Sequence, residues 1–124
     1  MKLNYLEQGT GSPVILMHGM FGSLSNLGNL ARALAGNYHV ISVDLRNHGD
    51  SPHEQRMDLE VMGKDIIELM DKLDIPSSTL IGHSLGGKVS MQVAMSQPDR
   101  VDSLVVADIS PVDYPEQNNN QVVS

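Results

Sequence analysis

A short glycine-containing stretch, residues 82–87, has the clearest chemical potential in the sequence. It places Ser84 two residues after Gly82 and two residues before Gly86, between an apolar run and a helix-like pattern. A nucleophile elbow requires this order of strand, sharp turn and helix, and its tight turn admits only small residues two positions before and two positions after the apex. The pattern predicts that Ser84 presents its hydroxyl at the end of a strand. The alternative is a plain glycine-rich turn with a surface serine.

A serine hydroxyl is a poor nucleophile at neutral pH, so it needs a base, a group that orients the base and donors for the oxyanion. The backbone amide of Leu85, directly after the serine, is one candidate donor. The other donor must come from the loop after the first buried strand, where Met20 or Phe21 could supply it. We also consider Phe21 as a substrate contact. His18 opens this loop, and a histidine in that position more often braces neighbouring loops than acts as the base.

The elements that must position these residues alternate along the chain. Continuous apolar runs predict buried strands at residues 14–17, 38–43, 79–82 and 103–107, with a short strand at 3–6. Helical spacing of apolar residues predicts helices at 23–35, 59–73 and 85–96, the second capped by Asp58. The polar tail over residues 111–124 is expected to be a loop. Strands that alternate with helices predict a parallel sheet of the α/β class.

Four chemically active residues fall at the carboxyl ends of the expected strands, namely His18, Asp44, Ser84 and Asp108. The carboxyl ends of parallel strands meet at one edge of the sheet, where the ligands of such sheets bind. We therefore expect these four residues to lie along one rim.

The bulk composition narrows the classes of function. The chain has 124 residues, 40% of them hydrophobic, which fits one domain or part of one. A formal net charge of −7 argues against nucleic acid and anionic membranes as partners. No signal-peptide pattern and no apolar run of roughly 18 residues is present, so a cytoplasmic location is expected. The chain has no cysteine, and its histidines lack metal-ligand spacing, so we expect no metal and no cofactor.

Taken together, these motifs resemble the α/β-hydrolase superfamily, and within it small bacterial carboxylesterases of the YbfF type. The resemblance rests on residues 14–23, 44–51, 82–87 and 108–114 and covers nearly the whole chain up to Tyr114. It implies a three-layer fold with a parallel sheet core and helices on both faces. It also implies a serine hydrolase that cleaves short acyl esters or thioesters through an acyl-enzyme intermediate.

The resemblance assigns roles to individual residues. Ser84 is the nucleophile, and Met20 and Leu85 are the oxyanion-hole residues through their amides. Asp108 is expected to be the triad acid, although in many relatives the acid lies one strand later, and Asp113 is a weaker candidate.

Three further residue assignments concern the loops beside this site. Asp44 and Arg46 are expected to brace the loops as a pair. His48 and His53 are expected to be solvated, and Asn26 could face the pocket.

A general base is missing from the sequence. In this superfamily the triad histidine follows the acid, but none of the five histidines follows Ser84. His83 is expected to point into the core or across the turn, away from the serine proton. We therefore expect residues 1–124 to form the N-terminal part of a single domain that is inactive alone. The cap and C-terminal strands would be absent, and the sheet would stop after the strand ending at Asp108.

Such a sheet would leave its last strand as an open apolar edge. The expected partners are therefore a small ester substrate and either the C-terminal half of the protein or a second copy across that edge. Two alternatives remain open. One is a half-domain that acts as an interaction module without catalysis, and the other is a hydrolase of the same fold that cleaves lactones or C–C bonds.

Overall fold

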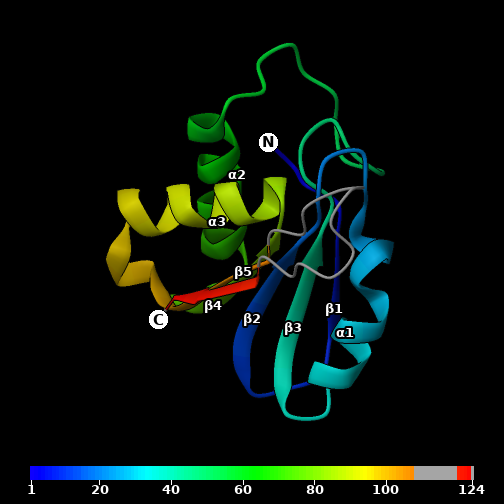
Figure 1. Ribbon diagram of the computed structural model, residues 1–124, viewed down its shortest axis with the longest axis vertical. Coiled ribbons are helices and arrows are strands. Elements are labelled where there is room, and N and C mark those ends of the chain that lie inside the picture. The colour runs from blue at the N-terminus through cyan, green and yellow to red at the C-terminus, as the bar shows by residue number, and fades with distance from the viewer. Residues whose placement is uncertain (108–119, 124) are drawn as a thin grey trace.

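The chain forms a six-stranded sheet with helices on both faces, in a computed structural model that describes residues 1–107 and 120–123 (Figure 1). The strands are β1 (Tyr5–Gln8), β2 (Ser12–Met17), β3 (Tyr38–Val43), β4 (Ser78–His83), β5 (Val101–Ala107) and β6 (Asn120–Val123). The α-helices are α1 (Gly28–Leu34), α2 (Leu59–Lys72) and α3 (Leu85–Ser96), and the 3-10 helices are η1 (Leu24–Leu27) and η2 (Pro98–Arg100).

The strand order is β1-β3-β2-β4-β5-β6. The four central strands run parallel, and β1 and β6 pair antiparallel at the two edges. From β2 the chain first adds β3 on one side and later adds β4 on the other, so strand order reverses between β2 and β4. The carboxyl ends of β2 and β4 therefore form a switch point, the place where such sheets bind ligands.

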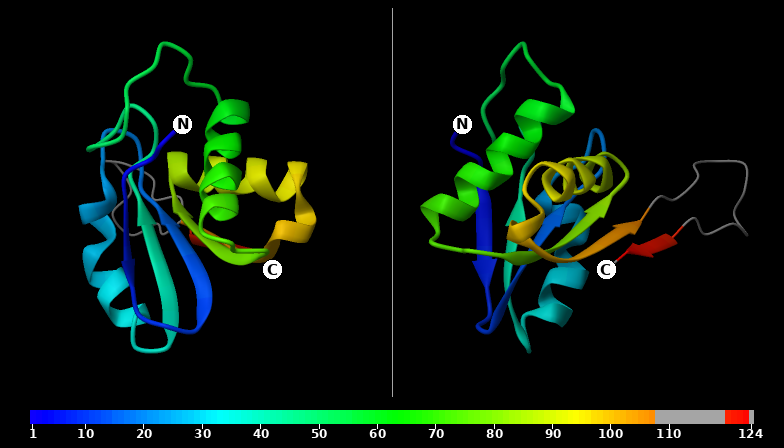
Figure 2. Two further views of the ribbon diagram at one scale, coloured as in Figure 1. Left: turned by 180° about the vertical axis from the view of Figure 1, so that it is seen from behind. Right: turned by 90° about the vertical axis from the view of Figure 1, so that its left-hand side faces the viewer.

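The helices form two layers, with α1 on one face of the sheet and α2 and α3 on the other (Figure 2). Alternate residues of β2 supply both interfaces, because successive side chains of a strand point to opposite faces. Ile15 and Met17 pack in the core under α2 and α3, whereas Val14 and Leu16 pack under α1. Burial on both faces explains the continuous apolar run in the sequence and confirms the three-layer fold.

Helix α2 begins and ends close to the predicted positions. The Asp58 carboxylate accepts a hydrogen bond from the amide of Val61 at 2.9 Å, which confirms the predicted cap. The predicted first helix is instead divided into η1 and α1. The Asn26 side chain accepts a hydrogen bond from the Ser23 amide at 2.7 Å and holds the first turn in the tighter 3-10 form.

The predicted loop over residues 111–124 is wrong at its end, because β6 pairs with β5 from Leu104 to Ala107. The expected open edge is therefore covered along that part of β5, and the sheet does not stop at β5. An edge strand can pair its backbone with any extended segment, so a strand of only four residues leaves little trace in a sequence. Residues 108–119, which include Asp113, lie outside the described residues.

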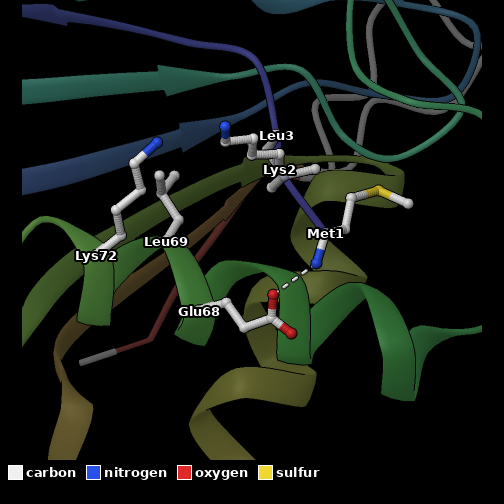
Figure 3. Close-up of a pocket in the computed structure, with 6 residues that line it drawn as sticks. All are labelled: Met1, Lys2, Leu3, Glu68, Leu69 and Lys72. Atoms are coloured by element: carbon white, nitrogen blue, oxygen red, sulfur yellow. Dashed lines mark hydrogen bonds and ion pairs between the residues drawn. The ribbon is translucent and has the colours of Figure 1, made fainter.

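The N-terminal segment packs on α2 and lines a cavity of about 330 Å³ (Figure 3). The terminal ammonium of Met1 donates to the carboxylate of Glu68 at 2.6 Å. The ammonium of Lys72 lies 5.3 Å from the ring centre of Tyr5. These contacts attach the N-terminal segment and the start of β1 to α2. In the described part of the chain, no helix has the length and apolar character needed to cross a membrane.

Candidate functional site

Ser84 occupies the turn between β4 and α3 with backbone angles φ 54° and ψ −112°. A positive φ is rare for a residue with a side chain, and such strain gathers at functional sites. Two hydrogen bonds hold the turn. The Ser84 amide donates to the carbonyl of Ala107 at 2.8 Å, and its carbonyl accepts from the amide of Lys88 at 3.1 Å. Ser84 is thus fixed at the carboxyl edge of the sheet, between β5 and the first turn of α3.

The glycines around Ser84 are required by close backbone contacts. A methyl group on Gly82 would collide with the carbonyl oxygen of Gly86, and one on Gly86 would collide with the carbonyl oxygen of Met17. The first turn of α3 therefore lies directly on the ends of β4 and β2. This agrees with the sequence-based expectation that both neighbours of the turn must be small.

The loop after β2 lies beside this turn. The amide of Gly86 donates to the carbonyl of His18 at 3.0 Å, and the amide of Gly22 donates to the carbonyl of Gly19 at 3.0 Å. Phe21 lies in the turn that the Gly22–Gly19 hydrogen bond closes, and its φ is 63°. Among the described residues, no hydrogen bond to another protein group involves the amide of Met20 or that of Leu85. Both amides are consequently available to a ligand.

His18 is fully buried, and both of its ring nitrogens are engaged. The amide of Leu45 donates to Nε2 at 3.0 Å, so Nε2 carries no proton. Nδ1 then carries the proton and donates to the carbonyl of Gly19 at 2.7 Å. Burial lowers the pKa of His18, and this favours the neutral ring that these contacts require. The ring therefore braces two loops and has no free nitrogen for the serine proton.

Asp44 is buried at the end of β3 and accepts three hydrogen bonds. One carboxylate oxygen accepts from the amide of Leu24 at 2.7 Å. The other accepts from the amide of Asp50 and from the side chain of Asn4, both at 2.9 Å. Burial alone would raise the pKa of Asp44, but these donors hold it below its ordinary value. Asp44 is thus an ionised brace between loops, as the sequence indicated.

Arg46 braces a different part of the structure. Its guanidinium donates two hydrogen bonds of 2.9 Å to the carboxylate of Asp65 on α2. A third bond of 2.8 Å reaches the carbonyl of Arg56. The paired hydrogen bonds to Asp65 raise the pKa of Arg46. Arg46 therefore attaches the loop over residues 44–58 to α2, and it does not pair with Asp44 as the sequence had suggested.

One of the histidines beside the site differs from its sequence-based description. His48 is buried, its ring centre lies 5.0 Å from that of His18, and its Nδ1 contacts the carbonyl of Arg46 at 2.9 Å. The prediction that His48 is solvated is therefore wrong, whereas His53 is exposed as predicted. His83 is half-buried and turns toward the loop after β2 instead of entering the core.

Two cavities flank the loop after β2. One, of about 360 Å³, is lined by His18, Gly19, Met20, Gly22, Asn26, Leu27 and His83. The other, of about 370 Å³, is lined by Met20, Phe21, Gly22, Asn47, His48, Gly49 and Met57. Met20 thus lines both cavities, and Asn26 lines the first, as expected. Sequence reasoning gave no role to Asn47, although it lies within the 44–51 motif, or to Met57, which lies outside every motif.

The predicted acid Asp108 lies outside the described residues. Its predecessor, Ala107, is the last residue of β5 and accepts the hydrogen bond from the Ser84 amide. In the described ranges, no three side chains of His, Cys, Asp or Glu gather as a metal site would require.

A family model described as the alpha/beta hydrolase fold matches residues 12–124. The chain belongs to the α/β hydrolase family. This α/β hydrolase chain is 43% identical to Esterase YbfF of Escherichia coli K12, over 98% of the chain and 50% of that protein. It is 47% identical to the sn-1-specific diacylglycerol lipase ABHD11 of Xenopus tropicalis, over 86% of the chain and 34% of that protein.

A solved structure of a marine microorganism esterase superposes on this α/β hydrolase with a TM-score of 0.85 and 39% identity. The superposition covers 91% of the chain and 44% of that structure. The chain thus spans at most about half the length of these relatives.

Proposed function

We propose that the protein is a serine esterase that cleaves short acyl esters or thioesters through an acyl-enzyme intermediate. The observation that carries the proposal is the strained backbone of Ser84, with φ 54° and ψ −112°, at the carboxyl edge of β4. Esterases and a lipase among the relatives of this α/β hydrolase support ester cleavage as the reaction class.

In the proposed reaction, the Ser84 hydroxyl attacks the ester carbonyl and its proton passes to a general base. The amides of Met20 and Leu85 donate hydrogen bonds to the oxygen that becomes negative. The alcohol or thiol then leaves with a proton, and water releases the acid from Ser84 by the same route. The two cavities beside Met20 would receive the acyl and alcohol parts of the substrate, and Phe21 would contact the substrate at one rim.

We further propose that Asp108 orients a histidine supplied by a part of the protein outside residues 1–124. His18 is unsuited to act as the base because both of its ring nitrogens are already bonded. The chain would then be the N-terminal part of a single catalytic domain and would be inactive alone. Its partner would be its own C-terminal half, or a second copy docked along the part of β5 that β6 does not cover.

The proposal is tested on the complete protein with a short-chain 4-nitrophenyl ester. Ser84→Ala should lower kcat by at least about 10³-fold, because the oxyanion donors alone give only weak catalysis. Ser96→Ala, at the far end of α3, is the matched control and should retain wild-type activity. Unchanged hydrolysis by a folded Ser84→Ala protein would refute the proposed nucleophile. Residues 1–124 alone should show no turnover above the buffer rate.

A further inference from the structure

The loop that carries Met20 is too exposed to be held by its own packing. The side chains of Met20 and Phe21 are 47% and 95% exposed. An oxyanion donor must nevertheless keep its place, because a displacement of about 1 Å can cost about 100-fold in rate. The Gly22–Gly19 hydrogen bond holds the turn itself, so the position of the Met20 amide relative to Ser84 depends on contacts at the two ends of the loop.

Two hydrogen bonds to the neighbouring loop supply such contacts: the loop accepts one of them and donates the other. At the start of the loop, His18 accepts from the backbone of the neighbouring loop, at Leu45. At its end, the backbone of Leu24 donates to Asp44 of that neighbouring loop. Each loop thus gives one side-chain acceptor and one backbone donor, and Met20 lies between the two contacts.

We propose that His18 and Asp44 form a reciprocal clamp that positions the Met20 amide for the developing oxyanion. Both are then positioning residues, since neither needs to touch the substrate. The inference rests on the proposed function, because it assigns these residues to the oxyanion loop of that same site.

The clamp is itself anchored on both sides. The hydroxyl of Ser51 donates to the Asp44 carbonyl at 2.5 Å, and the Asp50 amide occupies the carboxylate oxygen that Leu24 does not use. On the other side, the His18 carbonyl is bonded to the amide of Gly86 in α3. The contacts therefore run without a break from the end of β3, through the oxyanion loop, to the turn that holds the nucleophile.

The carboxylate of Asp44 is the side chain that this position requires. It only accepts hydrogen bonds, and three donors converge on it. An asparagine would turn its amide group toward at least one of these donors and lose that bond. Gly49 leaves the necessary space, since a methyl group there would collide with the Asp44 carboxylate.

The first test removes the Leu24 donor and leaves Asp44 intact. Leu24 is the first residue of η1, and Ser23 before it is extended, so proline fits there and deletes the N–H group together with the leucine side chain. In the complete protein, Leu24→Pro should lower kcat about 10- to 100-fold with KM within about threefold. The control Leu24→Ala shortens the side chain but keeps the donor, and it should stay within about threefold of wild type in kcat.

The second test alters the carboxylate. Asp44→Asn should lower kcat to a similar extent, whereas Asn4→Ala, which removes a donor on the side away from the loop, should not. If the carboxylate of Asp44 were only structural, Leu24→Pro and Asp44→Asn would lower the stability of the protein without a specific loss of transition-state binding. Affinity for a phosphonate ester that mimics the tetrahedral intermediate should therefore fall in parallel with kcat for Leu24→Pro and Asp44→Asn.

Hydrogen exchange separates failure of the clamp from failure of the proposed function. The amides of Gly22 and Leu45 should exchange faster in Leu24→Pro than in Leu24→Ala, whether or not any ester is hydrolysed. Equal exchange and equal kcat in those two variants would overturn the clamp. An inactive wild type with the predicted exchange difference would reject the esterase and keep the clamp as a loop brace.

Discussion

Gly19 lies directly against Ser84. A methyl group on Gly19 would stand 3.3 Å from the Cβ atom of Ser84 and 2.9 Å from Nδ1 of His83. A side chain at position 19 would therefore have to displace His83 and press on Ser84, so the loop after β2 and the turn after β4 are in close contact here. This contact brings the two proposed oxyanion donors, at Met20 and Leu85, to the same edge of the sheet.

The first prediction follows from this contact. Gly19→Ala should push the loop away from the turn and lower kcat by about 10- to 100-fold, because the donor at Met20 moves with the loop. Gly28→Ala is the control, since a methyl group there meets only the guanidinium of Arg32 at an ordinary 3.5 Å. Steady-state kinetics on the complete protein measures both, and equal kcat values for the two variants would contradict the prediction.

The second prediction concerns the ion pair between Arg46 and Asp65. Their side chains are only 11% and 4% exposed, so removing one leaves the other charged and buried. Asp65→Ala or Arg46→Ala should lower the free energy of unfolding by about 3 kcal/mol, as for other broken buried pairs. Urea unfolding of the complete protein measures the loss.

A double variant, Arg46→Met with Asp65→Leu, separates the contribution of the two charges from that of the space that the side chains fill. It should recover much of the lost stability, because apolar replacements of a buried pair are often neutral. Single variants within about 0.5 kcal/mol of wild type would show that the pair does not hold the loop to α2.

The third prediction concerns pH. The pKa of His18 is lower in the fold than its ordinary value of about 6.5, so the unfolded chain binds more protons as the pH falls below that value. The contribution of His18 is therefore complete above about pH 6.5 and is lost as the pH decreases toward the folded pKa. Its slope cannot exceed about 1.4 kcal/mol per pH unit.

Urea unfolding at pH 7.5 and pH 5.5 tests this sign. Wild type should lose more stability between the two values than His18→Gln, which cannot titrate but keeps an acceptor. The pKa of Asp44 is also lowered, but its contribution is lost only below about pH 3.9 and does not enter this window. An equal or larger loss in His18→Gln would contradict the neutral, accepting ring of His18.

The fourth prediction compares two buried serines. The hydroxyl of Ser42 in β3 has no hydrogen-bond partner among the residues that the structure describes. The hydroxyl of Ser90 in α3 donates to the carbonyl of Gly86 at 2.7 Å. Ser42→Ala should raise the free energy of unfolding by about 1 kcal/mol, and Ser90→Ala should lower it by about as much. Thermal or urea unfolding that ranks the two variants in the opposite order would refute this interpretation.

Much of the fold could be predicted because its signals are local. The apolar run over residues 38–43 and the helical spacing after Ser84 gave the bounds of β3 and α3 without error. The edge strand β6 was missed because its pairing uses backbone groups, which carry no side-chain pattern. The division of the first helix was missed because it depends on the side chain of Asn26.

The site was predictable where its requirements lie within a few residues. The need for small residues at Gly82 and Gly86 follows from the turn itself. The bond between Asp44 and Leu24 joins residues 20 positions apart, so no motif reveals it. His48 was misjudged for the same reason, since its burial depends on His18 in another loop.

The most direct test of the central claim is the site of covalent labelling in the complete, folded protein. A fluorophosphonate should modify one residue, and peptide mass spectrometry should locate the adduct on Ser84. Ser84→Ala should remain unlabelled, while Ser96→Ala should be labelled like wild type. An adduct on another residue, labelling that persists in Ser84→Ala, or an unlabelled wild type would contradict the assignment of Ser84 as the nucleophile.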